Sequence, residues 1–213
     1  MAITLTTIAG TTNNTSIASV NVNTADVGDI IVAFAHKNGE ANMGFNVNTT
    51  VMIITSSNTA IRMAYLVPSA TGAQTVTSTG GGLGGKHGLI ASVWSGVNTT
   101  TPIASTVNSS GASSVASGQL TGASSNVSVC AVVFNGQSTA ALTSGTGMVI
   151  DMTIGPSSVN STVPMVMAHK AFSSITETVS MNITASTLWW LGGVVLANAA
   201  AAVTARQQIV WMQ

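Results

Sequence analysis

The stretch Gly88-Leu-Ile-Ala-Ser-Val-Trp-Ser-Gly-Val-Asn-Thr-Thr-Thr-Pro102 joins an apolar run of strand length to a polar turn. The run from Leu89 to Ser95 carries β-branched residues and a tryptophan, a composition that favours strands. Gly96 and Asn98 then supply backbone freedom for a turn, and Pro102 cannot donate a hydrogen bond within a sheet. The stretch predicts a central strand and its exit in a β-sandwich, and it contains no catalytic motif.

Charged residues are rare in this chain. Asp, Glu, Lys and Arg make up 5% of its 213 residues, whereas ordinary globular proteins have about 25%. The formal net charge is zero, so the polar surface must consist largely of Ser, Thr and Asn, and copies do not repel one another. Phosphate binding needs clustered cations, and we therefore expect no nucleic-acid partner. The five cations are dispersed, at Lys37, Arg62, Lys86, Lys170 and Arg206.

The apolar content is high enough for a folded core. It reaches 46%, with a mean hydropathy of +0.49, which argues against a disordered linker. Residues 1–10 lack the basic and continuous apolar regions of a signal peptide, so we expect no export by that route. The most apolar segment, residues 188–203, is interrupted by glycines and is shorter than the roughly 20 residues that span a bilayer. We expect no membrane partner.

Short apolar or alternating runs, separated by turn residues, predict an all-β chain without sustained helical periodicity. Residues 30–36 are almost continuously apolar and should be buried on both faces. Residues 105–125, rich in Ser, Gly and Ala, are interpreted as a surface excursion that holds one weak strand. The expected strands cover residues 4–8, 17–22, 30–36, 51–54, 61–67, 74–79, 89–95, 127–134, 148–154, 163–172, 178–183 and 188–196.

This pattern predicts a two-sheet antiparallel β-sandwich that is jelly-roll-like. We expect a single domain over residues 1–197, followed by a C-terminal arm or short helix over residues 198–213. An exact sequence repeat is absent. Residues 29–36 and 126–134 nevertheless look like corresponding strands of two half-motifs.

Three segments carry a resemblance to a known kind of domain. In order, they are Val27-Gly-Asp-Ile-Ile-Val-Ala-Phe34, Arg62-Met-Ala-Tyr-Leu-Val67 and Ala91-Ser-Val-Trp-Ser-Gly-Val-Asn-Thr-Thr-Thr-Pro-Ile103. Together they resemble a jelly-roll-like β-sandwich domain of phage virion structural proteins and bacterial surface proteins, loosely over residues 20–197. The usual Asp of that family is Asn98 here. The resemblance implies a structural or adhesive role and supplies no catalytic residues.

Two patterns invite a chemical interpretation, and both have a simpler one. Residues 80–86 have the glycine and lysine spacing of a phosphate loop, but His87 follows instead of Ser or Thr, and a strand comes next. We interpret this segment as a flexible bend. Each histidine adjoins a lysine, which disfavours a bound divalent ion, so we expect strand-end histidines at a solvated edge or a subunit contact. The histidines are His36, His87 and His169.

The remaining reactive residue types are scattered. Asp26 and Asp29 could share a calcium ion, but a turn-forming pair is the stronger interpretation. Cys130, the only cysteine, lies in an apolar run and is expected to be a small core residue. We expect no catalytic residue, no cofactor and no metal. The tryptophans within apolar strands are expected in the core; these are Trp94, Trp189 and Trp190.

These expectations combine into a functional hypothesis. The leading hypothesis is a non-enzymatic virion protein of a tailed phage, either a capsid decoration (cement) protein or a tail or fibre component. Its partners would be further copies of itself and other virion proteins. An apolar C-terminal end requires a partner surface, and the expected contact residues are Arg206, Ile209, Val210, Trp211 and Met212. The alternative is a carbohydrate-binding or adhesive module whose partner is a host surface glycan.

Overall fold

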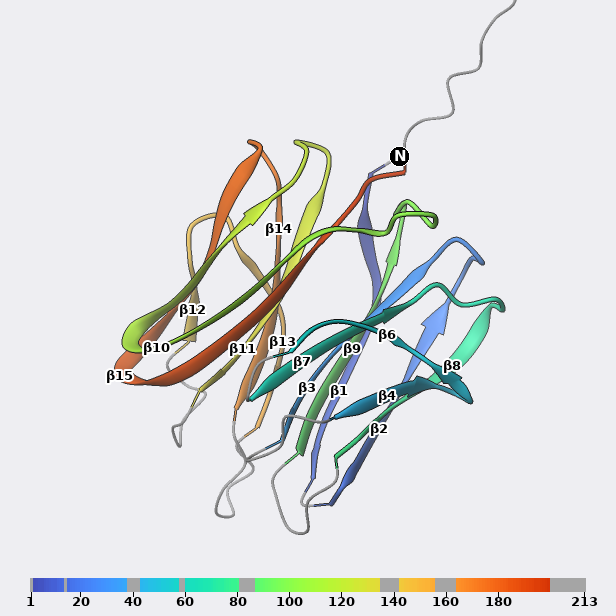
Figure 1. Ribbon diagram of the computed structural model, residues 1–213, viewed down its shortest axis with the longest axis horizontal. Coiled ribbons are helices and arrows are strands. Elements are labelled where there is room, and N and C mark those ends of the chain that lie inside the picture. The colour runs from blue at the N-terminus through green and yellow to red at the C-terminus, as the bar shows by residue number, and fades with distance from the viewer. Residues whose placement is uncertain are drawn as a thin grey trace, which may run out of the picture.

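The computed structural model describes residues 2–13, 15–37, 43–57, 60–80, 87–134, 142–155 and 164–199. These residues form fifteen strands and antiparallel sheets, and they contain no helix. The predicted all-β antiparallel sandwich is confirmed (Figure 1). The expected arm, residues 198–213, lies outside the described residues from residue 200 onward.

The first half of the chain forms two sheets with nested strand pairing. One sheet has the order β1-β9-β3-β7-β6 and the other β2-β8-β4-β5. β1 therefore pairs with β9, β2 pairs with β8, and β3 lies between β9 and β7. This nested pairing is the strand order of a jelly roll. The strands are β1 (Thr4–Asn13), β2 (Ile17–Thr24), β3 (Ile30–Lys37), β4 (Gly44–Val47), β5 (Thr50–Val51), β6 (Ile53–Ser57), β7 (Ile61–Leu66), β8 (Gly72–Thr79) and β9 (His87–Ser95).

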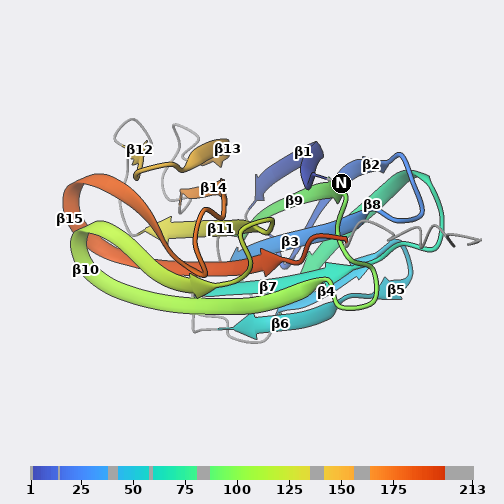
Figure 2. The ribbon, with the colours of Figure 1, turned by 90° about the horizontal axis from the view of Figure 1, so that it is seen from above.

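The second half repeats this order with fewer and longer strands. Its sheet runs β10-β15-β11-β14-β13, and β12 pairs with β15. The two longest strands, β10 and β15, pair with each other over most of their length and curl over at one end (Figure 2). The strands are β10 (Ile103–Thr121), β11 (Val127–Phe134), β12 (Leu142–Ser144), β13 (Val149–Ile154), β14 (Met165–Ala171) and β15 (Thr176–Leu196).

The two halves match in register as well as in order. The β1/β9 ladder shifts register between Leu5 and Thr7, and the β10/β15 ladder shifts at the corresponding place, between Ile103 and Ser105. The β6/β7 and β13/β14 ladders also share a shift, which places Ile53 opposite Tyr65 and Val149 opposite His169. The predicted correspondence of residues 29–36 with residues 126–134 is confirmed, because these are β3 and β11. We call residues 2–97 the first jelly roll and residues 103–199 the second.

One prediction about the second jelly roll was wrong. Residues 105–125 are not a surface excursion with a weak strand, because β10 pairs with β15 from Ile103 to Thr121. Its small polar side chains have little β propensity of their own. They alternate between half-buried and exposed positions, so β10 is held by its partner strand and not by its composition.

Three apolar layers hold these sheets together. The layer between the two large sheets comes from both jelly rolls and includes Phe34, Met63, Trp94, Val129 and Val194. A second layer fills the first jelly roll, and a third fills the second. Strands β3 and β9 therefore have a core on each face, as predicted for residues 30–36.

Glycines allow close packing between the jelly rolls, and Gly192 is one of them. A Cβ atom on Gly192 would lie 3.1 Å from Met63 Sδ and 3.3 Å from Ile61 Cγ2, closer than ordinary contact. Gly96, which was predicted to supply backbone freedom, has a φ of 74° and leaves no room for a side chain beside Ala2 O.

Because the inner apolar layer belongs to both jelly rolls, we expect Met63→Ala to weaken the whole molecule. Met63 is fully buried there, and such truncations cost about 2–5 kcal/mol of unfolding free energy. Ile53→Ala, at a side chain that is 55% exposed, is the matched control and should change stability by less than about 0.5 kcal/mol. Thermal melts followed by circular dichroism should show one transition for each protein, and two separate transitions would contradict a shared core.

Candidate functional site

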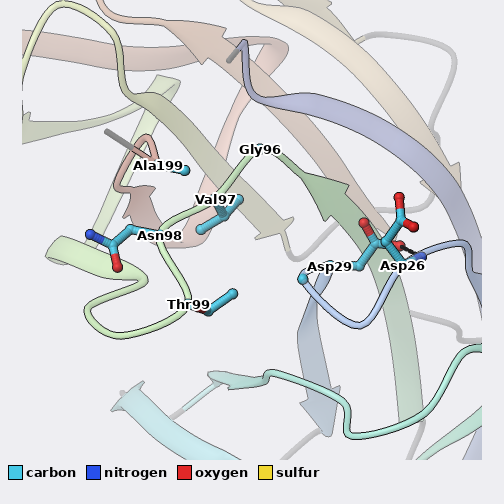
Figure 3. A pocket seen from close by; sticks show the side chains of 8 residues that line it. Asp26, Asp29, Gly96, Val97, Asn98, Thr99 and Ala199 are labelled. Atoms are coloured by element: carbon cyan, nitrogen blue, oxygen red, sulfur yellow. Dashed lines mark hydrogen bonds between the residues drawn. The ribbon is translucent and has the colours of Figure 1, made fainter. Parts of the chain in front are cut away.

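A surface cavity of about 470 Å³ lies beside residues 96–99, the turn that was predicted to follow the strand over residues 89–95. One wall is the turn between β2 and β3, and the other is the segment that follows β9. Figure 3 shows Asp26 and Asp29 on one side, with Asn98 and Thr99 on the other. The lining residues are Asp26, Gly28, Asp29, Gly96, Val97, Asn98, Thr99 and Ala199.

The two aspartates of this cavity build the turn. Asp29 is buried, and its Oδ2 accepts hydrogen bonds from the backbone N–H groups of Ala25 at 2.8 Å and Asp26 at 3.0 Å. The Asp29 N–H in turn donates to the carbonyl of Asp26 at 3.1 Å. The turn-forming interpretation is confirmed. Within the described ranges, no three His, Cys, Asp or Glu side chains gather as metal ligands would.

Asn98 shapes the opposite wall. Its Oδ1 accepts hydrogen bonds from the N–H groups of Thr100 at 2.9 Å and Thr101 at 3.1 Å. Its own N–H donates to the carbonyl of Ala197, and the Ala199 N–H donates to the carbonyl of Gly96, each at 2.8–2.9 Å. The exit of the first jelly roll is therefore tied to the end of the second.

We expect Asn98→Ala to lose about 1 kcal/mol of stability, because two backbone donors lose their side-chain acceptor. Asn98→Asp is the matched control, since a carboxylate oxygen accepts the same hydrogen bonds. Urea unfolding measures both differences. An alanine variant as stable as the parent protein would show that the Asn98 side chain does not hold this turn.

The predicted assembly contacts cannot be placed. Arg206, Ile209, Val210, Trp211 and Met212 all lie outside the described residues. The last described residues before them are held by the folded body: the Asn198 N–H donates to Asn126 Oδ1 at 3.1 Å, and Asn198 Nδ2 donates to the carbonyl of Ser125 at 2.9 Å.

The expectation of solvated histidines is wrong for two of the three. His36 and His87 lie at strand ends as predicted, but they are 3% and 1% exposed. His36 Nδ1 hydrogen-bonds the carbonyl of Ala60 at 2.5 Å, and His87 Nε2 contacts Ser78 Oγ at 2.7 Å. The neighbouring Lys37 is buried as well. The cause is that β3 and β9 run through the middle of the molecule, so their polar ends are enclosed by other strands.

Burial lowers the pKa of both histidines from 6.5 to about 4, with a further contribution at His87 from the positive charge of Lys37. Each ring is therefore neutral in the folded protein at neutral pH. Between about pH 6.5 and pH 4 the unfolded chain binds protons that the folded chain does not, so acid favours unfolding.

We expect the unfolding free energy to fall as the pH drops from 6.5 to 4, by up to roughly 3 kcal/mol for each of the two histidines. His87→Gln removes one titrating group while keeping a side chain that can hydrogen-bond Ser78, and it should remove part of this slope. Urea unfolding at half-unit pH intervals tests the effect. If the parent protein and the variant show the same dependence, His87 is not a source of acid sensitivity.

His169 differs from the other two histidines because it has a carboxylate partner. Its Nδ1 lies 2.8 Å from Asp151 Oδ1, and its ring packs against Trp94 in a T-shaped arrangement with the ring centroids 5.5 Å apart. The sequence analysis did not predict a carboxylate partner for His169. It missed this pair because Asp151 is the extra residue at the register shift of β13, so strand alternation does not predict its direction.

A second ion pair closes a turn in the second jelly roll. Lys170 Nζ lies 2.7 Å from Glu177 Oε2, while Glu177 Oε1 accepts hydrogen bonds from Ser173 and Ser174. The hydrogen bond from Lys170, followed by those from Ser173, holds the pKa of Glu177 well below its usual range. The carboxylate shapes this turn as Asp29 shapes the turn before β3.

The other sequence candidates are buried in cores or lie outside the described residues. Cys130 is fully buried, and burial raises the pKa of its thiol to about 12, which confirms a core residue. The strand predicted from Leu89 begins two residues earlier, at His87. The glycine-rich residues 81–86 before it are outside the described residues. Trp94 and Trp189 are buried as predicted, and Trp190 is half-buried.

Comparison with known proteins adds no relative. No protein-family model matches the chain, and no curated protein matches it either. Within the residues that the structure describes, no helix is long and apolar enough to cross a membrane.

Proposed function

We propose that the protein is a non-enzymatic virion structural component of a tailed phage, either a capsid decoration protein or a tail or fibre protein. It would act by self-association and by attachment to the particle. The observation that carries this proposal is the uncharged surface. Among the charged side chains of the described residues, Asp26 alone is exposed, and the others are half-buried or buried.

Such a surface favours contact between copies. Coulomb repulsion between copies is small at zero net charge, and Ser, Thr and Asn side chains are desolvated at lower cost than charged ones. Apolar side chains also reach the surface on both jelly rolls. The most exposed of them are Ile175, Val51, Val27, Ile53 and Val149.

The fold supports the proposal by analogy. Jelly rolls occur in viral capsid proteins, in lectins and in enzymes of the cupin type, so the fold alone does not select a function. The titratable side chains add a reason to favour a structural role. Asp29 and Glu177 accept hydrogen bonds that stabilise turns, and Asp151 pairs with His169. These three carboxylates therefore have structural partners.

The alternative, a carbohydrate-binding or adhesive module, depends on exposed aromatic rings beside polar groups. Trp94 is 1% exposed and Trp189 is 5% exposed. The indole N–H groups of both donate inward, to Ser92 Oγ and Ser113 Oγ. Trp190 is half-buried and packs against the inner apolar layer. None of these three rings supports sugar stacking, so the structural role is favoured.

The test is the mass of the protein in solution, with and without residues 200–213. The cut falls after Ala199 because Asn198 and Ala199 hydrogen-bond to the folded body. We expect the full chain to form a defined oligomer and the shortened chain a smaller species. Trp211→Ala with Met212→Ala should act like the truncation, and Gln207→Ala with Gln208→Ala is the matched control.

A full-length protein that is monomeric at high concentration and binds sugars on a glycan array would overturn the proposal and favour the adhesive module. An oligomer unaffected by removal of residues 200–213 would keep self-association but exclude the C-terminal segment as its contact.

A further inference from the structure

The buried carboxylate of Asp29 uses only one of its two oxygens in the fold. Oδ2 accepts the two backbone hydrogen bonds that close the turn between β2 and β3. Oδ1 is buried and has no hydrogen-bond partner, and the whole residue is 1% exposed. Taking a charged oxygen out of water without a partner costs free energy, so a group that binds Oδ1 would stabilise the folded chain.

Asp29 lines the 470 Å³ cavity beside residues 96–99, and the exposed Asp26 lines the same wall. Figure 3 shows the two aspartate side chains next to each other, with the dashed line marking the bond from the Asp26 N–H to Asp29. The other oxygen of Asp29 lies on the side of Gly96 and Val97, the facing wall. Two carboxylates on one wall attract a cation, and the unpartnered oxygen leaves a place for one.

No basic side chain among the described residues forms an ion pair with Asp29. Those of the first jelly roll belong to the opposite end of β3. Arg62 pairs with Ala35, which lies roughly 20 Å along the strand from Asp29. The two basic residues of the second jelly roll contact other carboxylates. The remaining basic residues, which lie at the end of β3 near Ala35, are His36, Lys37 and His87.

The lining of the cavity indicates the kind of cation. On the wall that faces the aspartates, Gly96, Val97 and Ala199 carry no polar side-chain atom. Asn98 Oδ1 already accepts two backbone hydrogen bonds. Calcium takes about six to eight oxygen ligands, more than the lining side chains supply. An organic cation can place its charge at the aspartates and its apolar part against Val97.

The geometry of the acceptors favours an ammonium over a guanidinium group. Asp29 has one oxygen to offer, so it cannot accept the two parallel N–H bonds that a guanidinium donates to a carboxylate. A primary ammonium carries three N–H donors on one nitrogen. It can therefore bind Asp29 Oδ1 and the carboxylate of Asp26 together.

We propose that Asp26 and Asp29 bind a primary ammonium group in this cavity, and that the alkyl chain of the ligand packs against Val97 and Ala199. The ligand is either a free small amine or a lysine side chain of another protein. Both present an ammonium on a short alkyl chain. The test has one arm for each source.

The probes are butylammonium chloride, for the free amine, and N-acetyl-lysine methylamide, for the lysine side chain. Each is added to the full-length ¹⁵N-labelled protein at pH 7, with sodium chloride at equal ionic strength as the control. The amide NMR signals of Asp26, Asp29 and Val97 should shift to saturation, with a dissociation constant on the order of 1 mM. Equal binding of both probes indicates a lysine side chain as the ligand, and binding of butylammonium alone indicates a free amine. Either result supports the site.

Asp26→Asn together with Asp29→Asn should weaken binding roughly tenfold or more, because both charges are lost. An amide oxygen at position 29 still accepts the hydrogen bonds of the turn. Asp26→Asn alone, at an exposed position, keeps the turn intact and should weaken binding by roughly threefold to tenfold. Glu177→Gln, which removes a carboxylate of the second jelly roll, is the matched control and should keep the parent affinity.

The proposal is overturned if the amide signals of Asp26, Asp29 and Val97 show no saturable shift with either amine. It is also overturned if Asp26→Asn binds butylammonium as tightly as the parent protein does. Calcium chloride is the last arm of the test. If calcium shifts the same signals to saturation and neither amine does, the cavity binds a metal ion and the ammonium proposal is wrong.

Discussion

The apolar layer between the two large sheets is the contact on which the rest of the molecule depends. It joins side chains from both jelly rolls, and it gives β3, β9 and β11 a second buried face. A strand of an isolated sandwich would show one face to water. Here the central strands can be apolar throughout, and the polar residues are left to the outer strands such as β2, which alternates strictly between exposed and buried positions.

The two jelly rolls differ in side chains that they bury outside this layer. Matching strand order and matching register shifts indicate one architecture used twice, while the side chains inside have diverged. Where the second jelly roll buries Trp189 and Phe134, the first buries His87 and Lys37. Shape and hydrogen-bonded framework are therefore shared by both halves, while the buried side chains at these positions differ.

The sequence predicted those parts of the fold that local pattern determines. Composition alone predicts buried strands around Ile30 and Leu89 and a turn after Trp94. Strand β10 could not be predicted in the same way, since its Ser, Gly and Ala residues become a strand only through β15. Local pattern could not predict the burial of His87 either, because strands that are distant in the sequence cover this residue. The contact between Asp151 and His169 depends on an added residue in one strand, which composition does not reveal.

The register shifts have a consequence for how copies can meet. All four outermost strands of the two large sheets, β1, β6, β10 and β13, contain such a shift. An added residue twists a strand and interrupts the row of free N–H and C=O groups that could template another chain. Many proteins guard their sheet margins with lysine, which this nearly uncharged chain scarcely has. Distorted margins at these edges therefore oppose growth into continuous cross-β fibres although the chain is nearly uncharged.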